Sequence, residues 1–275
     1  MLLLRPTLFC VLAAFVPFAS APAQSSPAAT PLSWTDWADL ALSSPVVIRA
    51  SVNRVDRLSR KEAPDVPAAE VRVLVRAGLS AALKSPSVLP AEAAWRWQGP
   101  ADARGRPPFG KQADVLVFAR PLGGGSDPAV QPLALISRSA QQPWSAEADA
   151  IVRDVLKQAL KPGATGLMVT GVRDAFHSDG DVAGASESQF FLRTEGGAPL
   201  TLVVTRAPGA SEAVLVATGD LVEMAQPVQP RTLLWRGLAC GMPDQLPVAF
   251  ASSPALAADW ALAKRRIGAC GRTAG

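Results

Sequence analysis

The sequence predicts a β-rich α+β protein: a small OB-like barrel or sandwich, then a linking helix, an antiparallel β-meander and a C-terminal helix. Short runs with period-two alternation and many β-branched residues occur in both halves of the chain. Proline (25 residues) and glycine (21 residues) are frequent in the 275-residue chain, which favours many turns. Hydrophobic residues make up 49% of the chain, enough to bury one large core or two modest ones.

Residues 1–23 have the pattern of a secretory leader. Arg5 precedes an apolar stretch from Leu8 to Phe18, and Ala21-Pro22-Ala23 offers the small residues of a cleavage site. Residues 24–31 are rich in serine, alanine and proline, and we expect them to form a mobile tether. The sequence therefore predicts a periplasmic or secreted protein.

The same apolar stretch is too short to span a membrane comfortably, and proline interrupts it. No other segment approaches the length of apolar sequence that a spanning helix needs. We therefore do not expect an integral membrane protein.

A β-rich, OB-like module is expected over residues 32–140. Ser33 can accept a hydrogen bond from a free N–H group of the first helical turn, and Asp36 follows three residues later, as in a capping box. Five short alternating runs follow this helix, a number typical of a small barrel or sandwich. The runs are residues 46–58, 71–79, 93–98, 114–120 and 133–138.

The order of these elements carries a resemblance. A helix, two long strands, a short strand around Trp95-Arg96-Trp97 and the run Val115-Leu116-Val117-Phe118 together resemble the OB-type barrel of secreted netrin-like modules. The chain departs from those modules in lacking the cysteines that usually staple them, and the resemblance transfers no functional residue. The whole chain is also similar to uncharacterised secreted proteins of Gram-negative bacteria, a likeness that implies no activity.

Residues 145–161 are predicted to form a helix that links the two β-rich modules. Apolar residues recur there at helical spacing, and Glu147 and Asp149 favour the start of the helix. Pro162-Gly163 ends it.

Residues 164–275 are predicted to form an antiparallel β-meander module with a C-terminal helix. Three β-rich runs lie between Ser188 and Val216, separated by turn signals at Gly196-Gly197 and Pro208-Gly209. Pro254–Ile267 has apolar residues at helical spacing. Further strands are expected at residues 166–177, 213–217 and 232–235.

Beyond the leader, the chain has two cysteines, Cys240 and Cys270. A single pair in an exported protein is most simply a disulfide, because thiols are oxidised in that compartment. The two residues are too far apart in sequence for a CxxC redox site.

His177 is the only histidine of the chain. A zinc site with several histidine ligands is therefore excluded, and any Ser-His-Asp or Cys-His arrangement would have to use this residue as its base. We interpret it as part of a hairpin, with a turn at Ser178-Asp179-Gly180 that the neighbouring carboxylates help to solvate. The alternative is a metal cluster formed by Asp174, His177, Asp179 and Asp181.

The segment Gly184-Ala185-Ser186-Glu187-Ser188 begins like a nucleophile elbow, with Ser186 as the nucleophile and His177 as the base. It ends in serine where the motif needs a second glycine, and it precedes a strand instead of joining a strand to a helix. No phosphate-loop or dinucleotide-binding pattern occurs, so no cofactor is expected.

The formal net charge of +4 is small and scattered, which argues against nucleic acid as a partner. With catalytic patterning this weak, we expect a non-catalytic protein that binds an envelope component, a protein or a glycan. The alternative is a hydrolase or metal-dependent enzyme with its site around His177 and Ser186.

Overall fold

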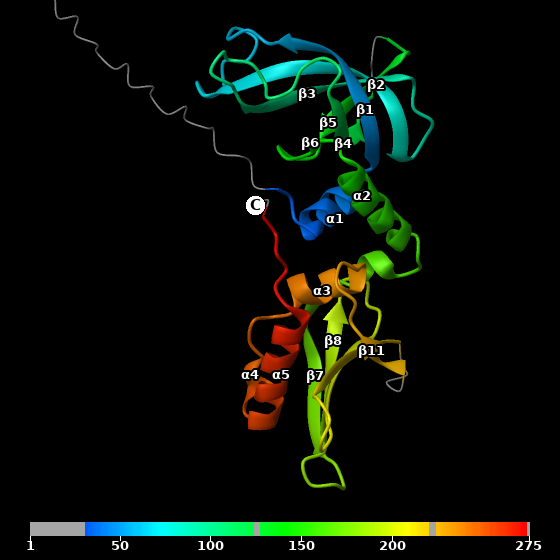
Figure 1. Ribbon diagram of the computed structural model, residues 1–275, viewed down its shortest axis with the longest axis vertical. Coiled ribbons are helices and arrows are strands. Elements are labelled where there is room, and N and C mark those ends of the chain that lie inside the picture. The colour runs from blue at the N-terminus through cyan, green and yellow to red at the C-terminus, as the bar shows by residue number, and fades with distance from the viewer. Residues whose placement is uncertain (1–30, 124–126, 220–223, 274–275) are drawn as a thin grey trace, which may run out of the picture. The chain divides into compact units, whose positions relative to one another are not determined.

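The structure, a computed structural model, describes residues 31–123, 127–219 and 224–273 (Figure 1). The predicted leader, residues 1–23, lies outside the described residues, and so does the predicted tether, residues 24–31, apart from Pro31. The chain from Leu32 onward forms one compact unit. Its fold confirms the predicted β-rich α+β class, with a closed five-stranded barrel, a second antiparallel sheet, and helices between and after them.

The barrel closes because its first strand pairs with two neighbours. Its strand order is β1-β2-β3-β5-β4, and β1 also pairs with β4. The inward side chains alternate with outward ones, and they include the fully buried Ile48 and Val73. Trp95, also in this core, donates from its indole nitrogen to Gln141 Oε1 at 2.7 Å. The strands are β1 (Val46–Arg57), β2 (Glu70–Lys84), β3 (Glu92–Pro100), β4 (Asp114–Pro121), β5 (Val130–Leu135) and the short β6 (Gln141–Pro143), which pairs with β4.

Two helices pack together beside the barrel. α1 (Trp34–Ser43) begins at the predicted capping box: Ser33 Oγ accepts from Asp36 N at 3.1 Å, and Asp36 Oδ2 accepts from Ser33 N at 2.8 Å. The helix predicted over 145–161 is α2 (Ala146–Ala159). Their apolar faces share a core with outward residues of the barrel, such as Phe118.

The second sheet is antiparallel, with the order β11-β10-β9-β8-β7. One face packs against α3 (Leu233–Gly241) and α5 (Pro254–Ile267), where Phe190 meets Trp260 edge to face at 5.2 Å between ring centroids. Figure 1 shows these helices beside β7 and β8. The remaining elements are β7 (Val169–Asp179), β8 (Ser186–Thr194), β9 (Leu200–Arg206), β10 (Ala213–Thr218), β11 (Gln226–Pro227), the 3₁₀ turn η1 (Ala164–Gly166) and α4 (Val248–Ala251).

Two sequence predictions in this half of the chain are wrong. Residues 232–235 are not a strand: Thr232 caps α3, and its Oγ1 accepts from Trp235 N at 3.1 Å. The turn is not at Ser178-Asp179-Gly180 either, because β7 continues to Asp179, which pairs with Ser186. Residues 180–185 form the loop instead, closed by a hydrogen bond from the amide of residue 180 to the carbonyl of residue 185.

Helix α3 lies unusually close to the chain that enters β7. A Cβ atom added to Gly237 would lie 2.2 Å from the carbonyl oxygen of Leu167, and one added to Gly241 would lie 2.2 Å from that of Val169. The two glycines are four residues apart, so they share one face of the helix. Backbone therefore contacts backbone along one turn of α3.

We expect Gly237→Ala to lower the free energy of unfolding by about 1–3 kcal/mol, because helix and β7 must separate to admit the methyl group. In an exposed helix the same change would stabilise by about 1 kcal/mol. Urea unfolding monitored by circular dichroism measures the difference. Gly110→Ala is the control, since an added Cβ there meets nothing within 4 Å. Equal stability of the two variants would contradict the close contact.

Candidate functional site

His177 lies near the end of β7, directly opposite Ser188 on β8. Its Nδ1 atom is 2.8 Å from Ser188 Oγ, and that hydroxyl donates to Asp259 Oδ2 on α5 at 2.5 Å. Arg206 on β9 forms an ion pair with the other oxygen of Asp259, and it also lies 3.4 Å from Glu212. A serine, a histidine and an aspartate thus meet, but in the order His-Ser-Asp.

This order reverses the proton path of a catalytic triad. In a triad the histidine accepts the proton of the serine hydroxyl and the acid orients the histidine. Here the single hydroxyl proton of Ser188 goes to Asp259, so Nδ1 of His177 is left to donate to Oγ. Ser188 therefore lacks the histidine base that a catalytic triad would supply.

Burial leads to the same conclusion. Ser188 and Asp259 are 0% exposed, while the side chain of His177 is 19% exposed. A substrate carbonyl could not reach Ser188 Oγ without displacing α5. We define these residues, His177, Ser188, Arg206 and Asp259, as the buried polar network, and we interpret it as the attachment of α5 to the sheet.

The structure does not gather the other predicted candidates into a site. Ser186 pairs with Asp179 at the end of the hairpin, two residues from the serine that contacts His177. Asp179 Oδ1 lies 3.5 Å from His177 Nε2, but its side chain is almost fully exposed. Asp174 bonds the neighbouring amide of residue 175, and Asp181 lies in the exposed loop. Among the residues that the structure describes, no group of three or more His, Cys, Asp or Glu side chains could hold a metal ion.

The sequence contains a signal for this network that periodicity alone did not reveal. Asp259 adjoins Trp260 on the apolar face of α5, although an unpaired acid is costly there. Ser188 continues the inward series of Phe190 on β8, and Arg206 ends the inward series of β9. Three polar residues in phase with core positions indicate that they bond one another.

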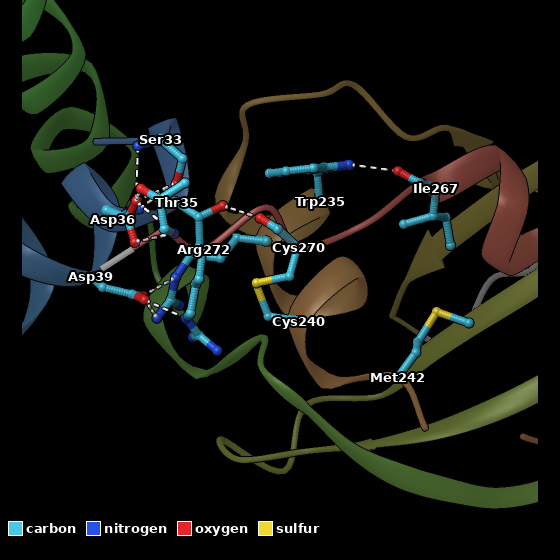
Figure 2. Close-up of a disulfide and its surroundings, with 12 residues drawn as sticks. Ser33, Thr35, Asp36, Asp39, Trp235, Cys240, Met242, Ile267, Cys270 and Arg272 are labelled. Atoms are coloured by element: carbon cyan, nitrogen blue, oxygen red, sulfur yellow. Dashed lines mark hydrogen bonds and ion pairs between the residues drawn. A yellow bond between two sulfur atoms is a disulfide. The ribbon is translucent and has the colours of Figure 1, made fainter. Parts of the chain in front are cut away.

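The predicted disulfide is present, with the Sγ atoms of Cys240 and Cys270 at a bonding distance of 2.13 Å. It attaches α3 to residues 268–273, which we call the strap. Figure 2 shows the strap reaching α1, where Thr35 Oγ1 donates to the carbonyl oxygen of Cys270 at 2.6 Å. Arg272 Nε donates to Asp39 Oδ2 at 2.7 Å. The disulfide joins the strap to α3, which packs on the second sheet. The strap in turn bonds α1, the helix that precedes the barrel.

A second candidate site is a cavity of about 750 Å³ that we call the junction pocket. It lies where the last turns of α1 and α2 meet the end of β2 and the side of α3. Leu42, Leu83 and Leu156 give it a partly buried apolar floor, and Leu160, 84% exposed, stands at its edge. Its volume is in the range of sites that bind small organic molecules.

Basic side chains outnumber acidic ones around this pocket. Lys84, Arg153, Lys157 and Arg236 line it, and Glu195 is the one acid among the described residues of the lining. Arg153 is paired with Asp149 at 2.5 Å, and Arg236 is paired with Asp39 on α1.

The two lysines have no carboxylate partner among the described residues. Lys84 Nζ donates to the carbonyl oxygens of Ala41 and Leu42, at 3.1 and 3.2 Å, and burial lowers the pKa of its ammonium group. The side chain of Lys157 has neither a hydrogen bond nor an ion pair in the described part of the chain. Among the described residues, therefore, no carboxylate lies within ion-pair distance of either ammonium group.

A smaller cavity of about 610 Å³ lies at one end of the barrel, lined by Arg57, Arg106 and Phe109 among others. Arg106 is already paired with Asp102 at 3.1 Å. We take the junction pocket as the stronger candidate because it is larger and its lysines lack carboxylate partners.

Comparison of the chain with models of known protein families gave no match, and comparison with curated proteins gave none either. Within residues 31–123, 127–219 and 224–273, none of the helices has the length and apolar character needed to cross a membrane.

Proposed function

We propose that this protein is a non-catalytic binding protein of the periplasm or the cell exterior, and that the junction pocket holds its ligand. The ligand is an envelope component, a protein or a glycan, as the sequence predicts. The observation that carries the proposal is a cavity of about 750 Å³ with an apolar floor and two lysines that pair with no carboxylate of the described chain. Ligand sites form preferentially at interfaces between domains and between packed helices.

Further support comes from the sequence. The leader pattern in residues 1–23 and the pairing of Cys240 with Cys270 both fit an oxidising compartment outside the cytoplasm. The relationship of the barrel to secreted netrin-like modules stays a prediction, with a closed five-stranded barrel in its favour.

The hydrolase alternative has less support. His177 is bonded to Ser188, not to Ser186, and the proton of Ser188 is directed to a buried acid. Neither serine thereby has His177 as a general base.

Complementation tests the proposal without presupposing a reaction. A strain that lacks the gene would receive the wild type or the variants His177→Ala, Ser43→Trp and Thr165→Trp, at matched periplasmic levels. We expect His177→Ala to complement, because loss of a structural hydrogen bond costs only about 1 kcal/mol. The two tryptophan variants should fail, because Ser43 and Thr165 are exposed residues on the wall of the pocket.

Val88→Trp is the control for the tryptophan variants, since Val88 is exposed and lies outside the pocket. Thermal unfolding must first show that all variants are folded. If tryptophan variants complement fully, the pocket is not the binding site and the proposed function is wrong. A folded His177→Ala variant that fails to complement would instead favour the enzyme alternative.

A further inference from the structure

The floor of the junction pocket is suited to an alkyl chain. Leu42, Leu83, Leu156 and Ala159 line it and are partly buried, and the exposed Leu160 also belongs to the lining. A bound chain would remove this leucine from water, at a gain of roughly 25 cal/mol per Å² of apolar surface.

The polar groups of the lining argue against the other ligand classes. Of the described residues that line the pocket none is aromatic, so a sugar ring would find no side chain among them to stack against. The volume of about 750 Å³ suits one small molecule and leaves no room for a folded protein. The lysines favour a ligand with a negative charge, and the leucines favour a ligand with an apolar body.

We propose that the junction pocket binds a single-chain lipid anion, an acyl chain with a carboxylate head that the ammonium groups of Lys157 and Lys84 hold. This inference rests on the proposed function and names the chemistry of its ligand. The acyl chain lies on the leucine floor, and the end of the chain remote from the carboxylate covers Leu160.

The two lysines have different parts in this arrangement. Lys157 is exposed on α2, so it can turn toward the head at little cost. Lys84 is partly buried and already holds two carbonyl groups of the last turn of α1. Burial lowers its pKa, and a nearby anion would favour its charged form again. The anionic head therefore offsets part of the desolvation cost that the ammonium group of Lys84 incurs on folding.

Titration calorimetry of the full folded chain with decanoate tests the inference. Its comparison ligands are 1-decanol, with the same chain and a neutral head, and decyl phosphate, with a different anionic head. In about 20 mM salt we expect decanoate to bind one-to-one, and at least about tenfold tighter than 1-decanol. Raising the salt to about 500 mM should weaken decanoate binding and leave 1-decanol almost unaffected.

Lys157→Glu is the decisive variant, because the side chain of Lys157 makes no hydrogen bond or ion pair with the described residues that its replacement would break. We expect it to weaken decanoate binding by at least about tenfold and to leave 1-decanol binding unchanged. Lys61→Glu makes the same charge change in an exposed loop of the barrel and should bind decanoate like the wild type. Leu160→Asp should weaken both ligands, whereas Val88→Asp should weaken neither.

Equal affinity for decanoate and 1-decanol, or no effect of Lys157→Glu, would overturn the assignment of the head. If decyl phosphate binds more tightly than decanoate, the assignment of a carboxylate head to the ligand is wrong. If decanoate does not bind and the tryptophan variants still fail to complement, the ligand class is wrong and the proposed function stands. If those variants complement, the proposed function itself has failed.

Discussion

Arg206→Met is expected to lower the free energy of unfolding by about 3–5 kcal/mol. The variant keeps most of the side-chain volume and removes the charge that compensates Asp259. This carboxylate is 0% exposed, so it would remain buried with a serine hydroxyl as its main partner. Urea unfolding at neutral pH, followed by circular dichroism, measures the loss.

Two further variants make the result interpretable. Arg54→Met removes an exposed arginine that pairs with Asp56 and should leave stability almost unchanged. The double variant Arg206→Met, Asp259→Leu replaces both charges by apolar groups and should be more stable than Arg206→Met alone. If Arg206→Met is as stable as Arg54→Met, the network does not attach α5 to the sheet.

Removal of the disulfide by Cys240→Ser with Cys270→Ser is the second change for which we expect a large effect. The bond closes a loop with a sequence separation of 30 residues, for which the chain-entropy relation gives about 3–4 kcal/mol. The strap would then be held to α3 by non-covalent contacts alone. We expect the free energy of unfolding to fall by that amount.

Hydrogen exchange locates the effect of this double variant. Amides of α1 should lose protection, because Thr35, Asp36 and Asp39 all bond the strap. Strands of the barrel core, such as β4, should lose only the protection that corresponds to the lower global stability. They therefore serve as the internal reference. Unchanged exchange in α1 would show that the strap stays in place without the disulfide. Freely alkylated thiols in native wild-type protein would contradict the disulfide itself.

Helices with strong local signals could be predicted from the sequence almost to the residue. The capping box of Ser33 and Asp36 fixes the start of α1, and the range Pro254–Ile267 predicted for α5 is the observed one. These signals are local: a cap, a helical period and a glycine or proline at the end. The alternating runs identified most of the strands for the same reason.

Features that depend on distant partners were harder to predict. Residues 232–235 contain a short apolar run that is compatible with a strand, and the sequence alone does not reveal that glycines at 237 and 241 let α3 contact the backbone that leads to β7. His177 was placed at a turn because Asp179-Gly180 is a common turn pair. The actual loop is longer, and His177 faces the core side, where it bonds Ser188. Neither the β1–β4 closure nor the junction pocket follows from local periodicity.

The strap also constrains when α1 can reach its final environment. Thr35 and Cys270, which are bonded in the folded protein, are 235 residues apart in sequence. A ribosome therefore delivers α1 long before the strap, and the barrel strands emerge between them. Until the strap has been made, Asp39 lacks Arg272, and the buried carboxylate of Asp36 lacks Thr273. We therefore expect α1 to reach its final environment only once the whole chain, including the strap, is available for folding.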